Sequence, residues 1–151
     1  MICASLLSSF MNEQHFLVRD GHPKEEINEK IAEIGDTFLS AIDVAYFDDA
    51  SPVEPIDLSL IQYMQMLQIA GVKVALDTGY PREIQDGLMK KLKFDQVVDA
   101  SVSAYEVRHG RPYPYMIFRL MEDLGVMNVR RVAKAGDSVR DMEEGRNAGE
   151  K

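Results

Sequence analysis

The fold is decided by residues 132–149, which read VAKAGDSVRDMEEGRNAG. A short apolar run ends at Gly136, Asp137 and Asp141 follow four residues apart, and a helical pattern leads on from them. This order predicts a strand, an acidic turn and a helix, as in a parallel α/β sheet. Because Asp141 comes about one helical turn after Asp137, both carboxylates can face the crevice beyond the strand, where ligands bind in such sheets.

The acidic pair has two interpretations. Two carboxylates with room for water suit a hard cation such as magnesium, which keeps several of its waters when a protein binds it. Acidic residues are also common at helix starts, because they accept hydrogen bonds from free amide groups and interact favourably with the helix dipole. The spacing alone leaves both interpretations open.

Length and composition limit the class of protein. The chain has 151 residues, 46% hydrophobic and 28% charged, which is typical of one globular domain with or without a small appendage. It contains neither an apolar run long enough for a bilayer nor a signal sequence, so we expect no membrane partner and a cytoplasmic location. The net charge of -8 argues against nucleic acid as the main partner. The single cysteine, Cys3, excludes an internal disulfide and a zinc site built on several thiolates.

The first third of the chain is predicted to form a helical hairpin. Residues 1–18 carry a loosely helical pattern, DGHP at residues 20–23 marks a turn, and residues 24–46 repeat apolar positions at helical spacing. A polar, proline-marked connector over residues 48–57 is the expected boundary. We therefore predict a helical region over residues 1–50 and an α/β core over residues 51–151.

The core alternates strand and helix patterns. Helices are predicted over residues 57–70, 82–92 and 113–124, and strands over residues 72–76, around 97–98, and over 131–135. This alternation indicates parallel βαβ units, whose loops after the strands open at one edge of the sheet. The acidic run Glu143-Glu144 is expected to lie on a solvated helix face.

Two more loops at that edge carry groups suited to an anion. The hydroxyl of Thr78 and the backbone N–H of Gly79 precede a predicted helix, a corner that suits a phosphate or another oxyanion. Arg111, which stands between Gly110 and Pro112, can hold an anion through paired hydrogen bonds. Each loop also fits a purely structural role, as a capped turn in the first case and a surface arginine in the second.

Taken in order, the three loops resemble the later motifs of the haloacid dehalogenase-like hydrolase superfamily. The stretches most similar to its phosphonoacetaldehyde hydrolase (phosphonatase) branch are VALDTGY, GRPYPYMI and KAGDSVRDMEEGRNAG, at residues 74–80, 110–117 and 134–149. The resemblance is specific over residues 72–149 and weaker over the helical first third. It implies a Rossmann-like parallel sheet, incomplete here, with a cap-like helical region at the N-terminus.

The resemblance also implies a role for each matching residue. Thr78 would hydrogen-bond the transferred phosphoryl group, with Gly79 beside it in the substrate site. Arg111 would balance the charge of the nucleophile and of the phosphoryl oxygens. Asp137 and Asp141 would anchor magnesium, directly or through water. The implied activity is the magnesium-dependent hydrolysis of a small phosphonate or phosphate ester.

One motif of the family is not found in this sequence. The family's attacking aspartate stands in a D-x-D/A-G-T type motif on its first strand, between the strands that bear the second and fourth motifs. Neither Asp20-Gly21 nor Asp36-Thr37 fits that pattern, and the cap lysine that forms a Schiff base in true phosphonatases is not identified either. We therefore expect a truncated hydrolase that is weakly active or inactive. A non-catalytic module that binds phosphate or a protein partner is the alternative, and an exposed sheet edge leaves a homo-oligomer open.

Overall fold

The computed structural model describes residues 23–54 and 57–149. The chain divides into two compact units, Met1–Val53 and Glu54–Lys151, and their boundary falls within the connector expected over residues 48–57. In the first unit, helix α2 (Lys24–Phe47) runs without interruption where the second arm of the hairpin was predicted. The predicted first arm, residues 1–18, lies outside the described residues. The division into a cap-like region and a hydrolase core stays a prediction.

Helix α2 is 24 residues long. Apolar residues recur along it at helical spacing, and Glu25 and Glu26 in its first turn interact favourably with the positive end of the helix dipole. Charged residues interrupt its apolar positions throughout. Each helix in the described part of the chain is too short or too polar to span a bilayer.

The second unit is built on a two-stranded parallel sheet. Strands β1 (Ala75–Thr78) and β2 (Ala100–Ser103) pair with Ala75 opposite Ala100 and Thr78 opposite Ser103. Between them lie α4 (Arg82–Lys91) and the short helix η1 (Phe94–Gln96). Both strands begin later than predicted. Val97, taken as a strand residue, is completely buried just after η1, so its apolar character reflects burial and not strand pairing.

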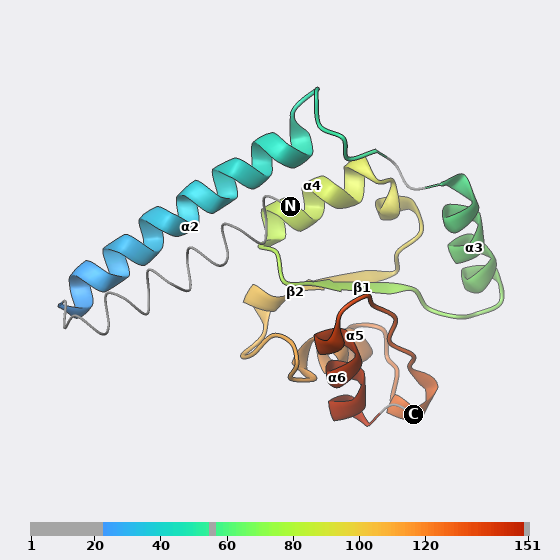
Figure 1. Ribbon diagram of the computed structural model, residues 1–151. Helices are drawn as coiled ribbons and strands as arrows, with labels where there is room; N and C mark the ends of the chain where they lie inside the picture. The colour runs from blue at the N-terminus through green and yellow to red at the C-terminus, as the bar shows by residue number, and fades with distance from the viewer. Residues whose placement is uncertain (1–22, 55–56, 150–151) are drawn as a thin grey trace. The chain divides into compact units, whose positions relative to one another are not determined.

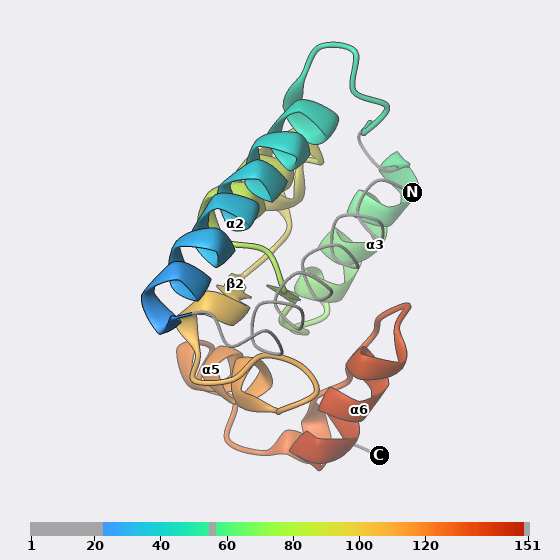
Figure 2. The ribbon, with the colours of Figure 1, turned by 60° about the vertical axis from the view of Figure 1, so that its left-hand side comes forward.

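Helices cover both faces of this sheet. Figure 1 shows α4 on one side of β1 and β2, and α5 (Tyr115–Asp123) and α6 (Val139–Ala148) on the other. The turned view in Figure 2 keeps α5 and α6 on their side of the strands. The core beneath β2 consists of Val102, Met116 and Leu120, with small side chains of both strands packed against it. The apolar stripe of α5 supplies two of these three residues, as its helical spacing predicts.

Helix α3 (Leu58–Ile69) precedes β1, and the short helix η2 (Ala104–Glu106) directly follows β2. Helix α3 lies within the helix predicted over residues 57–70 and begins where the carboxylate of Asp57 accepts a hydrogen bond from the N–H of Ser59, 3.1 Å away. These segments extend the βαβ unit at the two ends of its strands.

The predicted third strand, residues 131–135, is wrong. The short helix η3 (Val129–Arg131) occupies its start, and residues 132–136 have no regular structure. A strand requires a neighbouring backbone that pairs with it, and no part of the chain described by the structure supplies one to this segment. The neighbour expected from the family resemblance is the strand of the first motif, which the sequence does not show.

Asp99, directly before β2, joins the starts of the two strands. Its Oδ2 accepts hydrogen bonds from the N–H of Val74 at 2.9 Å and from Nε2 of Gln68 at 3.1 Å, and its Oδ1 lies 2.9 Å from Nζ of Lys73. The hydrogen bond from the Val74 backbone, followed by those from Gln68 and Lys73, lowers the pKa of Asp99 to about 2. The ionised carboxylate therefore stabilises the entry into the sheet.

We predict that Asp99→Asn lowers the free energy of unfolding at pH 7 by about 1–2 kcal/mol, because a neutral amide accepts these hydrogen bonds less strongly. A depressed pKa stabilises the folded state above the ordinary value of 3.8, and this stabilisation is lost as the pH falls toward about 2. Urea denaturation between pH 7 and pH 2 measures both effects. Asp95→Asn, an exposed residue of η1, is the control; equal losses in the two variants would contradict the assignment.

Candidate functional site

Three loops meet at the carboxyl end of β1. Thr78 is the last residue of the strand and Gly79 follows it, Arg111 lies in the loop before α5, and Asp141 lies in the first turn of α6. Nη1 of Arg111 forms an ion pair with Oδ1 of Asp141. Nη2 of Arg111 lies 3.7 Å from the position that a β-carbon on Gly79 would occupy. The structure thus brings Gly79, Arg111 and Asp141 together, as the order of the motifs predicted.

The hydroxyl oxygen of Thr78 accepts a hydrogen bond from the N–H of Tyr80 at 3.2 Å. Thr78 therefore forms a capped turn at the strand end, which was one of the two interpretations of this corner. The turn leaves Gly79 beside the guanidinium of Arg111. A local structural role and a position at the candidate site are compatible here.

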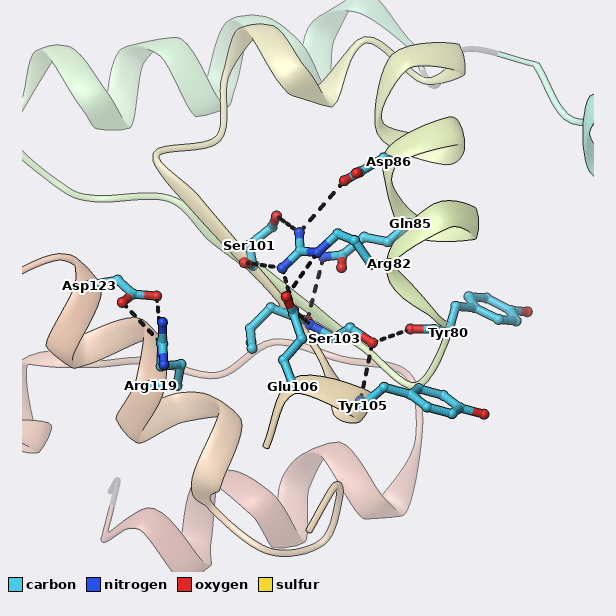
Figure 3. A network of polar contacts seen from close by, with 11 residues as sticks. Tyr80, Arg82, Gln85, Asp86, Ser101, Ser103, Tyr105, Glu106, Arg119 and Asp123 are labelled. Carbon is cyan, nitrogen blue, oxygen red and sulfur yellow. Dashed lines mark hydrogen bonds and ion pairs between the residues drawn. The ribbon is translucent and has the colours of Figure 1, made fainter. Parts of the chain in front are cut away.

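A polar network fixes the loop that follows Gly79 (Figure 3). Oγ of Ser103 donates a 2.6 Å hydrogen bond to the backbone carbonyl of Tyr80. Glu106 accepts a hydrogen bond from the N–H of Ser103 at 2.7 Å and another from Nε of Arg82 at 3.1 Å. The Ser103 backbone lowers the pKa of Glu106, burial opposes that effect, and Arg82 lowers the pKa further. The first turn of α4 and the end of β2 therefore hold the β1 loop in place.

Asp141 is the buried carboxylate of the site, with 3% of its surface exposed. It forms a capping box with Ser138: Oγ of Ser138 donates to Oδ2 at 2.5 Å, the N–H of Ser138 donates to the same oxygen at 3.2 Å, and Oγ accepts from the N–H of Asp141. Burial favours the neutral acid, but Ser138 and Arg111 outweigh it and lower the pKa of Asp141 to about 2. The carboxylate is therefore ionised at neutral pH.

Gly136 gives the Asp141 carboxylate the space that it occupies. A β-carbon at position 136 would lie 2.5 Å from Cβ and 2.7 Å from Oδ2 of Asp141. Side chains do not approach this closely without displacement. The glycine just before the acidic turn is therefore required for the close approach of helix α6 to the preceding segment.

Lys134 lies among three carboxylates. Its Nζ forms an ion pair with Asp77, lies 3.0 Å from Oε2 of Glu144 and lies 3.6 Å from Oδ1 of Asp141. One oxygen from each acid lies within 4.8 Å of the others. We name Asp77, Asp141 and Glu144 the acidic cluster. Burial opposes the charge of Lys134, but the attraction of Asp77 and then of Glu144 raises its pKa.

Glu144 corrects an expectation from the sequence. Glu143 is exposed as predicted, whereas Glu144 is completely buried and not part of a solvated face. Burial and then the charge of Asp77 raise the pKa of Glu144, and Lys134 opposes them. In the described part of the chain, Oε1 of Glu144 and Oδ1 of Asp77 are buried without a hydrogen-bond partner. Buried carboxylate oxygens without donors are suited to a cation.

The two predicted metal ligands lie in different environments. Asp141 belongs to the acidic cluster, whereas Asp137 is exposed and lies outside it. The metal-binding role of this pair stays a prediction. Sequence reasoning missed Asp77, Lys134 and Glu144. A signal existed for the first two, because each is a charged residue within or at the end of an apolar run, a place where charge is unusual unless it is paired.

A cavity of about 350 Å³ adjoins these residues. Its volume is at the lower end of the roughly 300–1,000 Å³ that is usual for small-molecule sites. The residues that line it include two arginines and no acid: Gly79, Ala104, Gly110, Arg111, Ser138 and Arg140. Its chemistry therefore suits a small anion.

We predict that Gly136→Ala lowers the free energy of unfolding by about 1–3 kcal/mol, because the added methyl group displaces the Asp141 carboxylate from its partners. Chemical denaturation measures the loss. Gly35→Ala is the matched control: this glycine is inside α2, a β-carbon there meets nothing within 4 Å, and alanine is the better helix former by about 1 kcal/mol. The prediction fails if the two alanine variants are equally stable.

Comparison with known proteins gives consistent matches. The sequence model of the haloacid dehalogenase-like hydrolases matches residues 8–149. A phosphonoacetaldehyde hydrolase of Bacillus cereus strain AH187 is 38% identical over 96 residues, which are 63% of this chain and 36% of the relative. Another Bacillus cereus phosphonoacetaldehyde hydrolase is 37% identical over 101 residues, or 66% of this chain and 37% of the relative. The chain therefore spans little more than a third of the length of these relatives.

Solved structures agree on the fold. A phosphonoacetaldehyde hydrolase-like protein of Oleispira antarctica matches with a TM-score of 0.68 and 22% identity, over 90% of this chain and 48% of that one. A putative β-phosphoglucomutase of Thermotoga maritima matches with a TM-score of 0.59 and 18% identity, over 88% and 57%. The prediction of an incomplete Rossmann-like sheet is confirmed. The resemblance of the sequence to the phosphonatase branch is supported by the matches of higher identity.

Proposed function

The chain belongs to the haloacid dehalogenase-like hydrolase family, and from this premise we propose that its site serves the magnesium-dependent hydrolysis of a small phosphonate or phosphate ester. The observation that carries the proposal is the meeting of Gly79, Arg111 and Asp141 at one edge of the sheet. These residues combine an anion-binding corner with a buried, ionised carboxylate. Both are needed where a phosphoryl group and a cation bind side by side.

Thr78, Gly79 and Arg111 form the anion-binding part of the proposed site. Arg111 is oriented by its ion pair with Asp141, and its second terminal nitrogen lies near Gly79 at the cavity. A guanidinium held in this way is preorganised for the oxygens of a phosphoryl group, and a backbone N–H beside it adds a fixed donor. Negative charge that develops on those oxygens during transfer would thus meet a positive group already in position.

The donor set of the acidic cluster fits magnesium. All its ligand atoms are carboxylate oxygens, and Oδ1 of Asp77 and Oε1 of Glu144 have no hydrogen-bond partner among the described residues. We propose that Asp141 and Asp137 hold the ion, as the family resemblance implies, with Asp77 and Glu144 completing the negative charge around it. When bound, magnesium would neutralise charge on the phosphoryl group. The ammonium of Lys134 already lies among these acids, so magnesium would bind beside it, on the side of the oxygens that it leaves unpaired.

The attacking group is the missing part of the proposed reaction. An aspartate that forms an aspartyl-phosphate is implied by the family resemblance, and no motif of the sequence matches it. We therefore propose that this chain corresponds to a truncated hydrolase. The second candidate function, favoured by the same observation, is a module that binds phosphate without turnover.

For magnesium binding, we predict that Asp141→Asn reduces the affinity by about 10-fold or more, because a charged ligand becomes neutral. Isothermal titration calorimetry with magnesium chloride measures the affinity, and circular dichroism verifies that the variant is folded. Glu143→Gln removes an exposed charge from the same helix and is the control. If Glu143→Gln weakens binding as much as Asp141→Asn, the ion is attracted by surface charge and the proposed site is wrong.

For turnover, we predict that the chain releases phosphate from p-nitrophenyl phosphate no faster than buffer with magnesium does, because the sequence offers no attacking aspartate. A continuous absorbance assay with and without magnesium measures the rate. Turnover that depends on magnesium and is lost on Asp137→Asn would contradict inactivity and support a complete enzyme. Phosphate binding without turnover would favour the binding module.

A further inference from the structure

Arg140 has no place in the functions described so far. It is the second residue of α6 and lines the cavity beside the candidate site. A positive charge in the first turn of a helix is unfavourable, because the free N–H groups there already form the positive end of the helix dipole. The structural role that would offset this cost is an ion pair with an acidic side chain.

Suitable acids are near in the sequence, but none is its partner. Asp137 precedes Arg140 by three residues, and Glu143 and Glu144 follow at the spacings that form ion pairs on a helix. All three acids are described by the structure, and none of them forms an ion pair with Arg140. Arg140 is exposed and is one of the residues that line the cavity.

Of the two arginines that line the cavity, one is paired with an acid and the other is not. Arg111 is paired with the ionised carboxylate of Asp141. Arg140 has no such pair among the described residues, and no acid lines the cavity. The uncompensated positive charge of the cavity therefore comes from Arg140. A cleft whose charged lining residues are all positive attracts an anionic group.

We propose that Arg140 recognises a second anionic group, such as a carboxylate, on the part of the substrate that is not transferred. The inference rests on the proposed function, in which Gly79 and Arg111 receive the phosphoryl group. The cavity of about 350 Å³ has room for a small organic group beyond the phosphoryl group. The substrate class is then a small phosphonate or phosphate that carries a second negative charge, and Arg140 is a residue that determines specificity.

The experiment compares two probes that differ in the second anionic group. Methylphosphonate has one anionic group, and phosphonoacetate adds a carboxylate. Isothermal titration calorimetry on the full chain with magnesium gives both affinities. We expect the chain to bind phosphonoacetate at least about 10-fold more tightly than methylphosphonate. This ratio of affinities corresponds to the free energy of one charge-assisted hydrogen bond. In Arg140→Gln this preference falls to about 1-fold to 2-fold, while the affinity for methylphosphonate is retained within about 3-fold.

Two further variants sharpen the test. Arg140→Lys keeps the positive charge but loses the planar guanidinium and its paired N–H donors. It should therefore retain an intermediate preference for phosphonoacetate over methylphosphonate. Arg146→Gln removes an exposed arginine from the last turn of the same helix, outside the cavity lining, and should leave both affinities unchanged. A preference that survives in Arg140→Gln, or equal weakening of both probes in it, would overturn the inference.

The proposed function has its own readout in the same experiment. Arg111→Gln should weaken both probes by about 10-fold or more, because both carry the phosphonate group. If this occurs without any preference for phosphonoacetate in the parent chain, the proposed site stands and the role of Arg140 is wrong. If the parent chain binds neither probe, both proposals are wrong.

Discussion

The carboxylate of Asp141 joins parts of the site that are distant in the sequence. Ser138 donates to it from the start of α6, Arg111 pairs with it from the loop before α5, and Lys134 lies 3.6 Å away. An ionised group in a protein interior is stable only with such partners. The buried carboxylate of Asp141 requires a glycine at position 136, because a β-carbon there would clash with it. It also requires the Arg111 loop to lie close enough for the ion pair.

The local elements of the fold were predictable, and the pairing between them was only partly so. Helices α4, α5 and α6 lie where the helical spacing of the sequence predicted them, because that signal acts within a few residues. Residues 131–135 carry an apolar run and yet form no strand. Their strand would require a partner backbone from elsewhere, and an apolar run carries no information about that partner.

The site shows the same division. The resemblance to family motifs led to Gly79, Arg111 and Asp141, which the structure brings together. It did not lead to Lys134, although a charge inside an apolar run was a signal for that residue. It did not lead to the burial of Glu144 either, because the residues beside Glu144 in the sequence did not predict a buried partner from another segment. A run of two glutamates is usually solvated, and here only the first one is.

We propose that one anion site forms where the β1 loop, the Arg111 loop and the start of α6 meet. A two-dimensional ¹H–¹⁵N NMR titration of the full chain with inorganic phosphate, in the presence of magnesium, tests it most directly. We expect the backbone amide signals of Gly79, Gly110 and Ser138 to shift together and to saturate at one common phosphate concentration. Saturating shifts confined to other parts of the chain, or none at these three amides, would contradict it.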